Sequence, residues 1–119
     1  MGTAMLQMLS PRAAKLTVRA AMQAVVATHK IIKRLADSTS NAGELQRYAL
    51  AMRGLTAEYT ELAERVLDQS EARYEPITER FISAAGALRA SYQRAQQLAA
   101  NMNLAADLMN AFGRLVSSF

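Results

Sequence analysis

The sequence predicts an all-α fold, arranged as an elongated antiparallel bundle of three long helices with a short C-terminal helix or helical extension. The composition supports this prediction, because the chain is 51% hydrophobic and has only two prolines and five glycines. Apolar side chains also recur in steps of three and four from Tyr74 to Phe119, and this spacing places them on one face of an α-helix. At 119 residues, the chain is expected to form a single domain, 1–119, with a coiled-coil-like core.

The first helix is expected over about 11–36. Ser10 is a residue type that caps helices, and Pro11 suits the first helical position, where its missing N–H costs nothing. The polar stretch 37–43 (Asp-Ser-Thr-Ser-Asn-Ala-Gly) is the clearest loop of the chain.

The second helix is expected over about 44–75, because Asn41 followed by Glu44 resembles a capping box. Its apolar seam also advances in steps of three and four: Leu45, Tyr48, Met52, Leu55, Tyr59, Leu62 and Val66. The seam loses its register near 69–76, and Pro76 stands at the same place. Because proline removes a helical hydrogen bond, we expect a break or sharp kink there.

The third helix is expected over about 76–100 and a short fourth helix over about 104–117. Asn101 and Asn103 favour a turn between them, but the apolar stripe keeps its register through both asparagines. One helix or two over 76–117 are therefore both compatible with the sequence.

The first helix carries a basic face. Its residues are Arg12, Lys15, Arg19, Lys30, Lys33 and Arg34. One interpretation is an anion-binding face for nucleic acid or another polyanion, and the other is an ordinary solvated surface. No aromatic residue lies among these cations, so stacking on bases has no support.

The second helix carries an acidic stripe, from Glu58 to Glu79 in steps of three and four, which we expect to face solvent. No histidine accompanies these acids, so no metal site is predicted. The single histidine, His29, is interpreted as a spacer at the edge of an apolar face, and the chain has no cysteine. No catalytic, metal-binding or cofactor-binding residue is predicted, and we do not expect an enzyme.

The C-terminal apolar stripe is the predicted interface. Its residues are Leu98, Met102, Leu108, Met109, Phe112, Leu115, Val116 and Phe119. The predicted function is therefore non-enzymatic protein–protein interaction, with a second copy of the chain or another helical protein as the partner. The alternatives are binding of nucleic acid or another polyanion by the basic face, and binding of a small molecule in a cavity lined by Met and Phe.

The compartment expected from the sequence is the cytoplasm. No apolar run approaches the roughly 20 residues that span a bilayer. The first residues, 1–9, lack the basic region and the long apolar core of a cleavable signal. Export without a cleavable signal stays open.

Overall fold

The computed structural model describes residues 15–119 and confirms the all-α fold, with no strand in this part of the chain. The helices are α2 (Val18–Ser38), α3 (Ala42–Gln69), α4 (Glu79–Ser83), α5 (Ala85–Leu98) and α6 (Ala106–Val116). Helix α2 begins later than the expected position 11, since residues 15–17 are not helical. The expected start at 11–14 lies outside the described residues.

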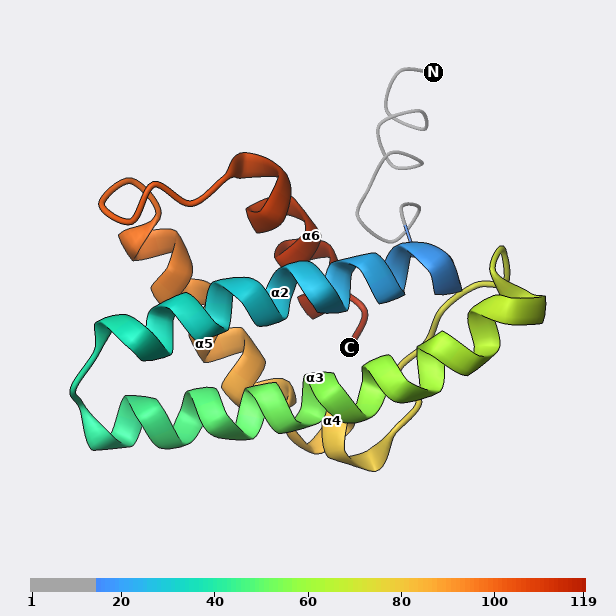
Figure 1. The fold of residues 1–119 in the computed structure, drawn as a ribbon, viewed down its shortest axis with the longest axis horizontal. Helices are drawn as coiled ribbons and strands as arrows, with labels where there is room; N and C mark the ends of the chain where they lie inside the picture. Colours follow the sequence, from blue (N-terminus) through green and yellow to red (C-terminus); the bar gives the residue numbers. More distant parts are fainter. Residues whose placement is uncertain (1–14) are drawn as a thin grey trace, which may run out of the picture.

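Helices α2 and α3 form an antiparallel hairpin (Figure 1). Side-chain caps fix where both helices begin. The Thr17 hydroxyl accepts a hydrogen bond from the Ala20 N–H at 3.1 Å. The Asn41 side chain accepts one from the Glu44 N–H at 2.9 Å, so the predicted cap is present, although α3 starts at Ala42 rather than 44. The Glu44 carboxylate accepts from the Thr39 hydroxyl instead of closing a capping box.

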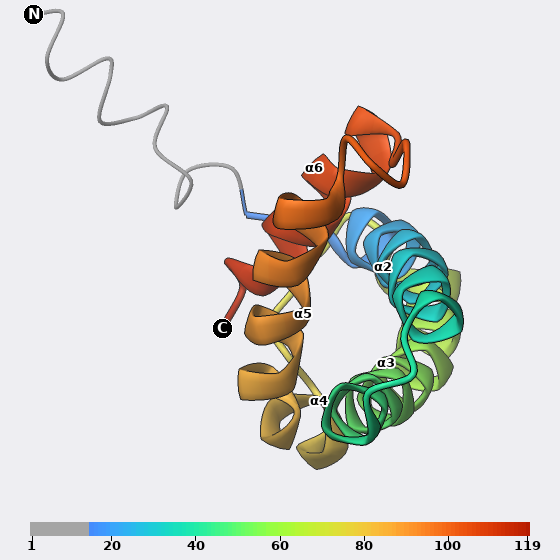
Figure 2. The same ribbon diagram turned by 90° about the vertical axis from the view of Figure 1, so that its left-hand side faces the viewer.

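Helices α4, α5 and α6 all lie on one side of the α2–α3 hairpin. Figure 2 views the hairpin along its length and shows these three helices as a second layer, with no helix of residues 15–119 on the hairpin's other side. Figure 1 shows α5 crossing behind the hairpin rather than running alongside it. Within residues 15–119, the hairpin therefore has an inner side, which α4, α5 and α6 cover, and an outer side, which no other helix of this range covers.

The break expected near 69–76 is present, but it is longer than expected. Helix α3 ends at Gln69 rather than 75, and the chain becomes helical again at Glu79 rather than 76. The reason is that the intervening segment pairs with the start of α2. The Val18 N–H donates to the Ala72 carbonyl, and the Tyr74 N–H donates to the Leu16 carbonyl, both at 2.9 Å.

A buried carboxylate fixes the rest of this segment. The Glu58 side chain is fully buried and accepts four hydrogen bonds. The donors are the Tyr74 hydroxyl at 2.5 Å, the Ile77 N–H at 2.8 Å, and the N–H and hydroxyl of Thr78 at 2.9 and 2.8 Å. Thr78 also caps α4 through the Phe81 N–H. We call this arrangement the Glu58 clasp. The expectation that Glu58 faces solvent was wrong, because the returning segment covers this side of α3.

The region expected as one helix over 76–100 is divided. Helix α4 ends at Ser83, and α5 follows from Ala85 to Leu98. Residues 76–117 do not form one helix, because a non-helical connection precedes α6. Helix α6 spans 106–116 rather than the expected 104–117. Asn103 in this connection has a positive φ of 52°, a conformation that asparagine tolerates better than most residues.

Candidate functional site

The predicted basic face is present on α2, but most of its described cations already have partners. Lys15 pairs with Glu75 at 3.8 Å, and Lys33 pairs with Asp37 at 3.9 Å. Other partners engage two more of the cations: the Arg19 guanidinium donates to the Ser70 hydroxyl at 3.3 Å, and the Arg34 guanidinium donates to the Met102 carbonyl at 2.5 Å. Lys30 is exposed, and no such contact involves it within residues 15–119. Arg12 lies outside the described residues.

The predicted C-terminal interface packs largely against the core. Phe112 and Leu115 are fully buried, and the Phe112 ring lies edge-on to Tyr92 at 5.1 Å. Phe119 lies 4.8 Å from the Phe81 ring. The remaining residues are half-buried against the same core: Leu98, Met102, Leu108, Met109 and Val116. This surface offers a partner less apolar area than the sequence suggests.

The α2–α3 hairpin carries an open groove of about 340 Å³ between its two helices. Its lining residues are Val25, Val26, His29 and Lys30 from α2, and Leu55, Thr56 and Tyr59 from α3. Val25 and Leu55 are buried, whereas Val26 is 40% exposed and Tyr59 is 42% exposed.

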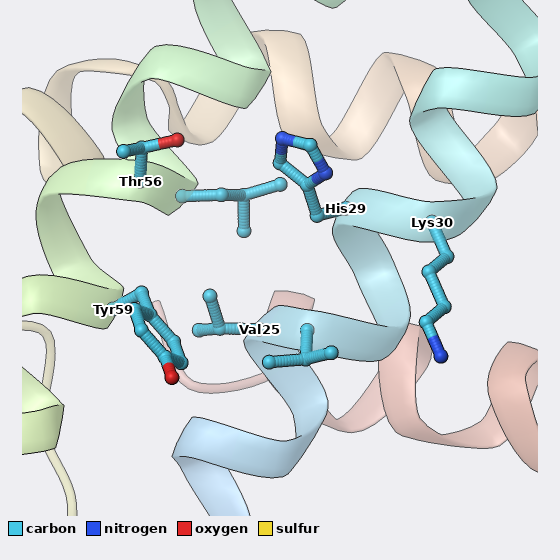
Figure 3. Close-up of a pocket in the computed structure, with 7 residues that line it drawn as sticks. Val25, His29, Lys30, Thr56 and Tyr59 are labelled. Atoms are coloured by element: carbon cyan, nitrogen blue, oxygen red, sulfur yellow. The ribbon is translucent and has the colours of Figure 1, made fainter.

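The groove offers a partner apolar contact and few polar groups. Figure 3 shows the ring of His29 and the side chain of Thr56 near one end, while Lys30 points away from the other labelled residues. The Thr56 hydroxyl donates to the Met52 carbonyl at 2.9 Å, so this polar group is satisfied by its own helix. His29 is half-buried and has no hydrogen-bond partner in the described part of the chain. The groove therefore suits binding of an apolar surface better than catalysis.

The groove is the centre of a longer apolar surface, which we call the outer face. On each helix its residues recur in steps of three and four, so they share one side of that helix. The outer face comprises Met22, Val26, His29 and Lys33 on α2, and Leu45, Ala49, Met52, Thr56, Tyr59, Ala63 and Leu67 on α3. Leu67 is 85% exposed, and the α3 part of the outer face contains no charged residue.

The Glu58 clasp is a structural element rather than a reactive site. Glu58 is sealed from solvent, and donors of the chain itself occupy its carboxylate oxygens. Burial raises the pKa of the Tyr74 hydroxyl well above its usual range, and the hydrogen bond to Glu58 and the charge of that carboxylate raise it further. Tyr74 therefore stays protonated and keeps donating to the carboxylate. No substrate can reach either group without unfolding the segment.

Across residues 15–119, no group of three or more His, Cys, Asp or Glu side chains could hold a metal ion. None of the helices in the same range is long and apolar enough to span a bilayer.

Comparison with known proteins gives no further guide. No protein-family model, no curated protein and no solved structure matches the chain.

The sequence contains a signal for the outer face. The expected seam of α3 joined residues that the structure buries with residues that it leaves exposed. Tyr48, Leu55 and Leu62 are buried, whereas Leu45 and Tyr59 are exposed. A stripe that is too wide for one seam indicates two apolar surfaces on one helix. Thr56 and Ala63, which lie three and four residues from Tyr59, indicate the second of these two apolar surfaces.

Proposed function

We propose that this chain is a non-enzymatic protein that acts through protein–protein contact, and that a second copy of the chain docks on its outer face. The observation that carries the proposal is the uncovered groove, where Val26 and Tyr59 stand exposed above a buried apolar floor. Exposed apolar surface of this kind typically marks an interaction site.

The size of the outer face suits a stable dimer. At 1.5 Å per residue, the 21 residues of α2 extend about 32 Å. Two packed helices are about 20 Å wide, so the face covers on the order of 600 Å² before its corrugation is counted. A standard interface buries about 800 Å² per partner.

The outer face is also complementary to itself. Val26 lines the groove from α2, and Tyr59 lines it from α3. A two-fold axis that runs along the groove would place Val26 of each copy against Tyr59 of the other. The same two contacts then occur twice, as in isologous dimers. The two hairpins together would form a four-helix bundle in which all neighbouring helices are antiparallel.

The C-terminal stripe and the basic face have weaker support as docking sites. Phe112 and Leu115 are already buried within the chain. Several cations of the basic face are engaged in hydrogen bonds or ion pairs. The groove contains neither Met nor Phe, so it does not correspond to the cavity expected from the sequence.

The solution mass of the chain tests the proposal. By sedimentation equilibrium at tens of micromolar and neutral pH, the wild type should be a dimer. Each buried apolar side chain contributes about 1 kcal/mol or more. The double variant Val26→Lys/Tyr59→Lys, which also adds cations beside Lys30, should therefore weaken the dimer at least about 100-fold.

A matched control separates this face from general surface hydrophobicity. Leu50 is 48% exposed and Ile82 is 49% exposed, but neither belongs to the outer face. The variant Leu50→Lys/Ile82→Lys should remain a dimer. A wild type that stays monomeric at several hundred micromolar would refute the proposal, as would equal dissociation of both double variants. Circular dichroism should show unchanged helicity in each variant.

A further inference from the structure

We infer that His29 makes docking at the outer face depend on pH, so that the dimer dissociates as histidine takes up a proton. This inference rests on the proposed docking of a second copy. His29 is the only histidine of the chain. It lines the groove, is half-buried before any partner arrives, and has no hydrogen-bond partner among residues 15–119.

The charged residues nearest to His29 along α2 are cations. Lys30 follows it directly on α2, and Lys33 lies one turn further along, paired with Asp37 at 3.9 Å. Across the groove, α3 presents Thr56 and Tyr59, neither of which is a carboxylate or a cation. No carboxylate lines the groove. Within a single copy, solvent screens these charges because the groove is open.

Charge also decides how the second copy would lie. If α2 of one copy packed on α2 of the other, Arg19, Lys30 and Lys33 would face the same cations of the second copy. If α2 packs on α3 of the second copy, these like charges are separated. Arg19 then comes near the acidic end of α3, where Glu64 and Asp68 are exposed. We therefore expect α2 to lie over α3 of the second copy.

In this arrangement, no acid of the second copy comes level with His29. The residues of α3 across the groove from His29 are those around Leu55 and Thr56. The stretch 51–57 contains Arg53 and no acidic residue. A protonated imidazole would thus lose its hydration in the dimer and gain no carboxylate in its place. Both effects penalise the charged ring in the dimer.

The dimer therefore contains neutral imidazole, and dissociation allows each chain to bind one proton. Association is therefore strong above the pH range in which histidine titrates, and it is lost as the pH falls below that range. A histidine in water titrates near pH 6.5. Because each dimer releases two chains, its dissociation constant should rise about 100-fold between pH 7.5 and 5.5.

Sedimentation equilibrium at pH 7.5 and 5.5, at equal ionic strength, tests the inference. The wild type should lose about 100-fold in affinity at the lower pH. The variant His29→Gln should have the same affinity at both values. The permanently charged variant His29→Arg should dissociate already at pH 7.5.

The outcomes distinguish the two proposals. A dimer whose affinity does not change with pH refutes the role of His29 and leaves docking at the outer face intact. A pH dependence that persists in His29→Gln would likewise refute the role of His29 and leave docking at the outer face intact. A monomer at every pH and concentration refutes both.

A second measurement reports the imidazole itself. Because the chain has one histidine, its ring resonances give an unambiguous proton NMR titration. The ring should take up its proton at lower pH in a concentrated, dimeric sample than in a dilute, monomeric one. Equal titration curves in the two samples would overturn the inference.

Discussion

The two sides of the α2–α3 hairpin are built from the same residue types but have different surroundings. Tyr48 and Leu62 of α3 are fully buried, and α4, α5 and α6 cover the inner side of the hairpin. On the outer side, Val26 and Tyr59 remain exposed. The comparison shows that a helix side becomes core only where the rest of the chain returns to cover it. Here the returning segment is fixed by the Glu58 clasp.

The strongest test of the inner side removes the clasp. Glu58→Ala leaves the Tyr74 hydroxyl and the N–H groups of Ile77 and Thr78 buried without acceptors. We expect a loss of about 3 to 5 kcal/mol in the free energy of unfolding. That loss is a large share of the 5 to 15 kcal/mol typical of a domain. Urea denaturation followed by circular dichroism measures it.

The matched control for the clasp is Glu64→Ala, because Glu64 lies on the same helix but is exposed. Its effect should stay within about 0.5 kcal/mol. Equal effects of the two substitutions would show that the clasp does not hold the inner side closed.

Alanine substitutions at two glycines test how closely the layer of α4, α5 and α6 packs against the hairpin. Gly54 on α3 faces α4, and a Cβ added there would lie 2.9 Å from the Ala84 Cβ and 3.1 Å from the Arg80 carbonyl oxygen. Gly54→Ala should therefore destabilise the fold by about 1 to 2 kcal/mol, despite the higher helix propensity of alanine. Thermal unfolding should show a clear fall in Tm.

Substitution of the second glycine, Gly86, should change the stability in the opposite direction. A Cβ added at Gly86 on α5 would meet nothing within 4 Å. Gly86→Ala should raise the stability by about 0.5 to 1 kcal/mol through helix propensity alone. If both substitutions stabilise the protein, α3 and α4 are not in the close contact described here.

The sequence was a good guide to the hairpin and a poor guide to the covering layer. Helix periodicity is a local property, so the loop before α3 and its Asn41 cap could be recognised from the residues themselves. The break at Pro76 was also visible for this reason. What could not be seen is where the chain goes after the break, because that depends on contacts between residues far apart in sequence.

Glu58 shows this difference most directly. In the sequence it belongs to a regular acidic stripe, and nothing local separates it from Glu61 or Glu64. It is buried because Tyr74, Ile77 and Thr78 return from a distance of 16 to 20 residues and donate hydrogen bonds to it. The same limitation hid the outer face, because Tyr59 is apolar in either setting and only the missing cover distinguishes it from Tyr48.

A further prediction concerns a buried hydroxyl on the inner side itself. Thr28 on α2 is fully buried, and its hydroxyl oxygen has no hydrogen-bond partner among the described residues. Valine has nearly the same shape without the hydroxyl, so Thr28→Val removes an unsatisfied polar group and leaves the packing intact. We expect a gain of about 1 kcal/mol, seen as a rise in Tm of about 4 °C. The same substitution at the exposed Thr60, whose hydroxyl donates to the Thr56 carbonyl at 3.1 Å, should change the stability by less than about 0.5 kcal/mol. A loss of stability in Thr28→Val would mean that the buried hydroxyl is satisfied, for instance by an internal water. The inner side would then be wetter than its apolar composition suggests.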